Sequence, residues 1–181
     1  MNEQEIITIL TLVGDELQAI GLRRPIRLLL IGGAYMLTQI HNRPSTRDVD
    51  VIVVEPEITS EDYRIFKQAV QFVAHDRGIS AAWLSDNIAQ FLQSTGDVPV
   101  GTLWLAHGML KVYIPDAGYI LVTKVLAGRD RDVPDIEALL DHLGITSRQQ
   151  VEELLAIYLS PQTRRDYRTD LQLTLDALFT D

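Results

Sequence analysis

Two aspartates, Asp48 and Asp50, lie in an otherwise apolar, β-branched segment that ends at Val54. Such a segment predicts a buried strand over 48–54. Alternate side chains of a strand share a face, so both carboxylates are expected on the same side. Their mutual repulsion and desolvation would be relieved by Mg²⁺, which prefers oxygen ligands and is held by one or two carboxylates with water and phosphate. The alternative is an exposed strand end at which both acids bind nothing.

A glycine pair precedes these aspartates, at the end of another apolar run, Pro25 to Ile31. The run predicts a buried strand that enters a tight turn at Gly32 and Gly33. Since glycine has no Cβ, a phosphate can approach the backbone there, and the helix expected over 34–40 would offer N–H groups and a positive dipole end. Most glycine pairs are simple turns, so this pair counts only together with the two aspartates. Neither the dinucleotide-binding nor the P-loop glycine pattern occurs in the chain.

The segments Leu30 to Ala34 and Arg43 to Val51 together resemble the nucleotidyltransferase fold shared with polymerase β. The shared pattern is a hydrophobic residue, Gly-Gly or Gly-Ser, about ten to fifteen residues, and then Asp-hydrophobic-Asp. The likeness is strongest to small bacterial nucleotidyltransferase-like proteins, including those related to the AbiEii-type toxins of toxin–antitoxin systems. Residues 123–136 resemble the same proteins in a Lys-x-x-Ala segment, a following Arg and an Asp-x-x-Asp helix start. The resemblance covers residues 25–142.

The resemblance implies a Mg²⁺-dependent nucleotidyltransferase that moves a nucleoside monophosphate from an NTP to an acceptor. Asp48 and Asp50 would hold the metal ions, which align the attacking group and stabilise the leaving pyrophosphate. The two glycines would cradle the terminal phosphates, and Arg47 or Lys124 would add charge-assisted contacts. The acceptor is expected to be a small molecule, a protein or an RNA end, and a toxin–antitoxin system is one expected context.

Two departures from the family pattern leave the catalytic step open. Active relatives often carry Ser after the first Gly, whereas this chain has Gly33 followed by Ala34. The third carboxylate of the family lies on a later strand, and the candidate strand over 109–114 holds no acid. Asp116, just past that strand, is the preferred third catalytic acid, and Glu55 is the other candidate. Without a third acid the general base is unassigned, and the alternative function is a non-catalytic module that binds a nucleotide or a protein.

Composition limits the class of protein. The chain has 181 residues, of which 46% are hydrophobic and 23% charged, which fits one globular domain and excludes wholesale disorder. Its 25 acidic and 16 basic residues give a net charge of −9, so general nucleic-acid binding is not expected, because phosphate contacts need clustered Lys and Arg. The absence of Cys excludes disulfide scaffolds, zinc fingers and cysteine nucleophiles.

An acidic N-terminus and the lack of an apolar run of membrane length predict a cytoplasmic protein with no membrane partner. The expected partners are an NTP, the unknown acceptor and either a partner protein or a second copy of the chain.

The elements that must position the site predict an α/β protein of the α+β kind and a single domain over 1–181. We expect a small mixed β-sheet over 25–116 as the nucleotidyltransferase-like core, flanked by helices, and a C-terminal helical region over 117–181. The direction of the first two strands relative to each other stays open, because the connection between them is short. Further strands are expected as a hairpin over 100–106 and 109–114.

Apolar residues at spacings of three and four predict the helices. Ser60 is the expected N-cap of one of them, and Ser160 with Pro161 should open a single last helix. The segment 79–92 is not assigned. The expected helices cover 3–20, 34–40, 60–77, 117–127, 133–143, 148–159 and the stretch from 161 to 178.

Overall fold

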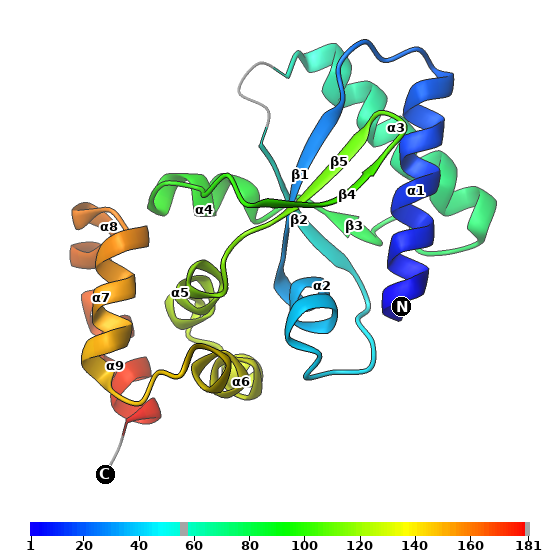
Figure 1. Ribbon diagram of the computed structural model, residues 1–181. Coiled ribbons are helices and arrows are strands. Elements are labelled where there is room, and N and C mark those ends of the chain that lie inside the picture. Colours follow the sequence, from blue (N-terminus) through cyan, green and yellow to red (C-terminus); the bar gives the residue numbers. More distant parts are fainter. Residues whose placement is uncertain (55–57, 180–181) are drawn as a thin grey trace. The chain divides into compact units, whose positions relative to one another are not determined.

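The computed structural model of the chain describes residues 1–54 and 58–179 (Figure 1). The chain divides into two compact units, one formed by Met1–Ala89 with Val100–Pro115 and the other by Gln90–Pro99 with Asp116–Asp181. The first unit carries the sheet, and the second is helical. The expected fold class, a small mixed sheet flanked by helices with a helical C-terminal region, is confirmed.

A five-stranded mixed sheet in the order β3-β2-β1-β5-β4 forms the frame of the first unit. The central strand β1 (Ile26–Ile31) runs antiparallel to β2 (Val49–Val53) and parallel to β5 (Leu110–Ile114). The prediction that β1 and β2 are neighbours is confirmed. Their direction is antiparallel, which agrees with the short connection, because a parallel pair needs a longer crossover.

The two edges of the sheet differ in length. Strand β4 (Thr102–His107) pairs with β5 as the expected antiparallel hairpin, with a register shift between Leu103 and Leu105. Strand β3 (Leu84–Ser85) adds two residues parallel to β2. It lies in the segment that the sequence left unassigned, because two residues are too few to show a strand period.

Helices α1 (Glu3–Ala19) and α3 (Ser60–Arg77) supply the core on one face of the sheet (Figure 1). Each has an apolar stripe at helical spacing, and alternate strand residues meet these stripes. The N-cap of α3 is Thr59 rather than the expected Ser60, since the Thr59 hydroxyl accepts from the N–H of Asp62 at 3.0 Å. The strand residues in this core include Leu28, Leu30, Val49, Val51 and Val112.

Helix α1 touches the turn of the β4–β5 hairpin through two glycines. The N–H of Met109 donates to the carbonyl oxygen of Gly14 at 3.1 Å. A Cβ on Gly14 would lie 2.2 Å from the carbonyl oxygen of His107, and a Cβ on Gly108 would lie 2.2 Å from the carbonyl oxygen of Gly14. The two backbones are therefore in direct contact, with no room for a side chain at either glycine.

This contact predicts the sign of a stability change. In an ordinary helix interior, Gly→Ala stabilises by about 1 kcal/mol. At Gly14 we expect the opposite, a destabilisation of about 1–3 kcal/mol, because the added methyl overpacks the helix against the hairpin. Denaturant unfolding of Gly14→Ala measures the difference, and Gln18→Ala at an exposed position of the same helix is the control. A more stable Gly14→Ala variant would contradict the contact.

The second unit consists of helices. The expected last helix is two helices, α8 and α9, separated by Tyr167, whose φ of −99° and ψ of 15° leave the helical geometry. The apolar stripe does not reveal this break, because it keeps helical spacing across it. Among the described residues, no helix has the length and apolar character needed to cross a membrane. The helices are α4 (Ala89–Thr95), whose first residue still belongs to the first unit, α5 (Ala117–Ala127), α6 (Val133–Leu143), α7 (Arg148–Tyr158), α8 (Pro161–Asp166) and α9 (Arg168–Leu178).

Candidate functional site

The glycine turn and the second aspartate, Asp50, meet at one end of the sheet. In the β1–β2 register Ile31 lies opposite Asp50, so the residue before Gly32 is the cross-strand neighbour of the second aspartate. Val49 is fully buried in the core, and strand alternation therefore directs the half-buried Asp50 to the opposite face. Asp48 is exposed and lies one residue before β2 begins.

Gly32 lies directly against the carboxylate of Asp50. Its φ is +63°, and a Cβ at this position would lie 2.5 Å from Oδ2 of Asp50. Both the left-handed conformation and the close approach require glycine. The backbone of the turn and a carboxylate that can bind a metal are therefore in immediate contact.

The helix after this turn is short. Helix α2 (Gly32–Tyr35) is a single turn, and the chain continues as a π-helix over Met36–Ile40. A helix dipole is the sum of aligned peptide units, so one turn contributes little of it. Positive charge for a phosphate at this turn must come from side chains.

Two residues of the loop between the π-helix and β2 lie over Gly33. A Cβ on Gly33 would lie 2.8 Å from Oγ1 of Thr46 and 3.2 Å from the guanidinium nitrogen Nη1 of Arg43. Thr46 is buried, and its hydroxyl donates to the carbonyl oxygen of Asp48 at 3.0 Å. Its N–H donates to the carbonyl oxygen of Met1 at 2.9 Å. Thr46 thereby fixes the loop to the glycine turn, to the aspartate segment and to the residue that precedes α1.

Arg47, the loop residue that the sequence singled out for phosphate, is exposed. Within the ranges 1–54 and 58–179, no hydrogen bond or ion pair holds its side chain. Sequence reasoning missed Arg43 and Thr46 because loop side chains follow no period. The one signal for them was their place between the two halves of the motif.

Lys124, the other expected phosphate contact, lies in the second unit at the centre of an ion-pair cluster. Its Nζ is 2.6 Å from Oδ2 of Asp135 and 2.9 Å from Oδ1 of Asp132. The three side chains are 8%, 3% and 15% exposed. The cluster joins α5 to the start of α6 and already neutralises the ammonium group. A phosphate contact by Lys124 would require it to leave a carboxylate.

Asp116, the preferred third acid, also lies in the second unit, where it caps α5. Its Oδ1 accepts from the N–H of Tyr119 at 3.1 Å, and its Oδ2 accepts from the hydroxyl of Tyr158. Burial, the bond to Asp116 and its negative charge raise the pKa of the Tyr158 phenol. Burial raises the pKa of Tyr119 to about 12. Both oxygens of Asp116 are thus bound by groups of its own unit.

Among the described residues, a metal at this site would be bound by two carboxylates, those of Asp48 and Asp50. In the described part of the chain, no three His, Asp or Glu side chains are arranged to hold a metal ion. Glu55, the other third-acid candidate, lies outside the described residues. Two carboxylate donors beside an approachable backbone fit Mg²⁺, which fills its remaining positions with water and substrate phosphate, better than a cation that needs an all-protein cage.

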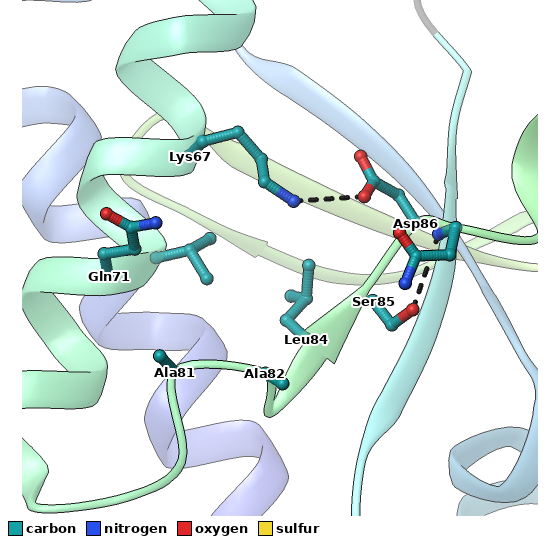
Figure 2. A pocket seen from close by; sticks show the side chains of 9 residues that line it. Lys67, Gln71, Ala81, Ala82, Leu84, Ser85 and Asp86 are labelled. Atoms are coloured by element: carbon teal, nitrogen blue, oxygen red, sulfur yellow. Dashed lines mark hydrogen bonds and ion pairs between the residues drawn. The ribbon is translucent and has the colours of Figure 1, made fainter.

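A separate pocket of about 200 Å³ lies between α3 and the segment around β3 (Figure 2). In Figure 2, Lys67 of α3 extends toward Asp86, and the distance from its Nζ to Oδ1 is 3.0 Å. The hydroxyl of Tyr63 donates to Oδ2 of Asp86 at 2.6 Å. Ser85 lines the pocket and is also the cross-strand neighbour of Asp50. The pocket therefore lies beside the strand of the aspartate pair, but its charged groups already bind one another.

The carboxylate of Asp86 is held in its ionised form. Burial alone would raise its pKa, but the hydrogen bonds from Tyr63 and Lys67 outweigh burial and hold the pKa below the ordinary value of 3.8. The hydrogen bond from Tyr63 to Asp86, together with burial and the charge of Asp86, raises the pKa of Tyr63 to about 12. Since the folded pKa of Asp86 is depressed, its stabilising contribution is present above pH 4 and is lost as pH falls through the folded value.

These shifts predict a late alkaline titration. Tyr63, Tyr119 and Tyr158 should ionise at a pH well above 10, the ordinary pKa of a tyrosine hydroxyl. Because their folded pKa values are raised, the stability linked to them is full below pH 10 and is lost as pH rises through about 12. Tyrosinate absorbance measures the titration, and Asp86→Asn should bring the ionisation of Tyr63 to lower pH. An unchanged titration in Asp86→Asn would contradict the Tyr63–Asp86 bond.

The structure thus brings together Gly32, Gly33 and Asp50 and adds Arg43 and Thr46 to them. Asp48 is linked to this group through its carbonyl oxygen, which accepts from the hydroxyl of Thr46. Arg47 is exposed beside this group, and Asp116 and Lys124 are bound within the second unit. No protein-family model, no curated protein and no solved structure matches the chain. Its function must therefore be inferred from the residues of the site.

Proposed function

We propose that the chain is a Mg²⁺-dependent nucleotidyltransferase, which moves a nucleoside monophosphate from an NTP to an acceptor. The observation that carries this proposal is the contact between the carboxylate of Asp50 and the backbone of Gly32. It supports a site in which a metal-binding group and a phosphate-accessible turn serve the same ligand. The motif resemblance supports the same assignment, whereas a glycine turn or an acid pair alone would not.

Asp48 and Asp50 would hold Mg²⁺, which when bound neutralises the triphosphate and stabilises the leaving pyrophosphate. The glycine turn admits the phosphates to the backbone, and Thr46 keeps the loop and the aspartate segment in place. The acceptor oxygen forms a bond to the α-phosphorus while the bond from that phosphorus to the bridging oxygen breaks. Pyrophosphate leaves with the bonding electrons, and the acceptor proton passes to water. Because the proposed substrate is an NTP, we infer that the reaction takes place in the cytoplasm.

A second candidate function is a module that binds Mg²⁺ and a nucleotide without catalysis. It is favoured by the lack of a third metal-binding acid among the described residues and by the bonds of Asp116 to Tyr119 and Tyr158. Both candidates share the same binding site and differ only in the transfer step.

The test uses NTPs with radioactive phosphorus at either the α or the γ position, incubated with the chain, Mg²⁺ and cell extract. Nucleotidyl transfer puts the α label on an acceptor and leaves the γ label in pyrophosphate. The double variant Asp48→Asn, Asp50→Asn should put no α label on an acceptor and release no γ-labelled pyrophosphate. If the chain binds Mg²⁺–NTP but transfers no α label from any of the four NTPs, the enzyme is excluded in favour of the binding module.

A further inference from the structure

The pocket of about 200 Å³ lies at the β3 edge of the sheet, beside α3 (Figure 2). Figure 2 shows Lys67 and Gln71 on its helix side and Leu84 on its strand side. Leu84 pairs with Val49 and shares the core with it, whereas strand alternation directs Asp50 to the opposite face of the sheet. The described residues that line the pocket include neither aspartate of the proposed nucleotide site. The pocket is therefore a separate place for a ligand.

The charged groups that line the pocket neutralise each other. Nζ of Lys67 lies 3.0 Å from Oδ1 of Asp86, and the hydroxyl of Tyr63 donates to Oδ2 of Asp86 at 2.6 Å. The side chain of Asp86 is only 11% exposed. A ligand ion of either sign would have to separate this pair and would leave one of its charges poorly compensated. An uncharged ligand leaves the pair intact, so the pocket favours one.

One backbone N–H and one C=O at this edge have no partner in the sheet. The N–H of Val49 donates to the carbonyl oxygen of Trp83 at 2.7 Å, and the pairing with β2 continues at Ser85. Backbone groups of successive strand residues face alternate edges, so those of Leu84 face the free edge. Leu84 is only 3% exposed, and neither group has another partner among the described residues. Since buried peptide groups are nearly always paired, the pocket favours an occupant that offers an acceptor next to a donor.

Two carboxamides at the rim have the same double capacity. Gln71 of α3 and Asn87, which follows β3, both line the pocket and are exposed. Within the described parts of the chain, neither side-chain amide has a hydrogen-bond partner. A carboxamide both donates and accepts, and so does an amide group of a ligand. The remaining wall is apolar and includes Val70, Ala82 and Leu84.

Size limits the occupant to a single ring. An apolar cavity of about 150 Å³ holds benzene, whereas pockets for drug-sized ligands measure about 300–1,000 Å³. A volume of about 200 Å³ therefore suits one ring with a polar group. A peptide strand is disfavoured, because the carbonyl oxygen of Asp86, the next residue on the free edge, already accepts from the N–H of Ala89 at 3.0 Å. The open stretch of edge is thus one residue long.

We propose that this pocket binds a small uncharged cyclic amide, a lactam or a cyclic urea, whose C=O and N–H pair with the backbone of Leu84. A ring holds the amide in the cis form, with its N–H and C=O on the same side, so that both can reach one residue. An open-chain secondary amide is trans and directs the two groups apart. The ring would pack on Val70 and Ala82, and the carboxamide of Gln71 would add a hydrogen bond. The proposal is independent of the proposed function.

The test is titration of the full, ¹⁵N-labelled chain with 2-piperidone, a six-membered lactam, followed by the backbone amide signals in NMR spectra. The N–H signal of Leu84 should shift together with those of Ala82 and Ser85. Cyclohexanone has the same ring size and a C=O but no N–H, and piperidinium has the same ring size and a charge. Both should bind at least about fivefold more weakly, because each leaves a buried group unpaired or disturbs the ion pair.

A pair of variants on one helix tests the role of the rim. Gln71→Ala should weaken 2-piperidone binding by about twofold to tenfold, the usual effect of losing a neutral hydrogen bond. Gln68→Ala, at an exposed position of α3 that does not line the pocket, should leave the affinity unchanged. Both variants should fold, because alanine favours a helix.

Three results would overturn the proposal. Equal affinities for 2-piperidone and cyclohexanone would reduce the pocket to an apolar cavity. Tighter binding of piperidinium would exclude an uncharged ligand. If 2-piperidone at about 10 mM, where even weak ligands of this size bind, shifts no signal of the residues that line the pocket, the pocket does not bind cyclic amides. Equal affinities in the two glutamine variants would remove Gln71 from the site.

Discussion

Replacing Asp48 and Asp50 together by Asn abolishes Mg²⁺-dependent NTP binding and leaves the chain folded. Asn keeps the shape of each side chain and removes the charges that the cation needs. Loss of both ionic contacts lowers the affinity at least about a hundredfold, since each contact to a charged group contributes about 1.5–3 kcal/mol. The variant unfolds cooperatively as the unaltered chain does, and relief of repulsion between the two carboxylates opposes any loss of stability. Calorimetry with and without Mg²⁺ measures the binding, and thermal unfolding measures the stability.

A matched control removes two carboxylates far along the chain from the site. Asp76 and Asp141 are exposed positions on α3 and α6, and Asp76→Asn with Asp141→Asn changes the net charge by the same amount. We expect this control to bind Mg²⁺–NTP as the unaltered chain does. Equal loss in both double variants would reduce the effect to net charge, and retained binding in Asp48→Asn, Asp50→Asn would exclude the site.

Replacing Lys124 by Met destabilises the chain by about 3–5 kcal/mol. The substitution removes the cation from a cluster in which Asp132 and Asp135 have side chains only 15% and 3% exposed. A buried ion pair that loses one partner leaves an uncompensated buried charge, which is the costly change, and here two carboxylates are left. Denaturant unfolding, followed by helical circular dichroism, measures the free energy of unfolding.

Lys67→Met is the comparison, because Lys67 pairs with a single carboxylate, Asp86, and its own side chain is 35% exposed. We expect it to cost less than Lys124→Met, because the hydroxyl of Tyr63 still donates to Asp86, which is 11% exposed. A Lys124→Met effect no larger than that of Lys67→Met would contradict the structural role of the cluster. Lys124→Arg, which keeps the charge, separates a phosphate contact from a structural one. If the Lys124→Arg variant remains stable but binds NTP more weakly, the result supports the phosphate contact that the sequence predicted for Lys124.

The elements with a strong local pattern were predictable from the sequence. Helix α5 has the expected bounds, since apolar spacing defines its length and Gly128, at a φ of +56°, ends it. The β4–β5 hairpin also follows from its two short apolar runs. The break at Tyr167 and the two-residue strand β3 depend on tertiary packing, and neither interrupts a period that can be counted.

The site was predictable to the same extent. The contact of Gly32 with Asp50 follows from two neighbouring strands that each carry half of a motif. The place of Arg43 does not follow, because the loop conformation is fixed by Thr46, whose N–H donates to the carbonyl oxygen of Met1, ahead of the first helix. The cluster of Lys124 with its two carboxylates was missed for a related reason. Spacings of eight and eleven residues cross from one helix to the next, and no helical period links them.

The most direct test of the nucleotide site is a crystal structure of the chain grown with Mn²⁺ in place of Mg²⁺ and an NTP that cannot be cleaved between its α- and β-phosphates. The anomalous scattering of Mn²⁺ locates the metal independently of the protein coordinates. The proposed function predicts a metal bound by Asp48, Asp50 and the phosphates of the nucleotide, with the phosphates against the glycine turn. Metal and nucleotide bound elsewhere, or neither bound at saturating concentrations, would contradict it.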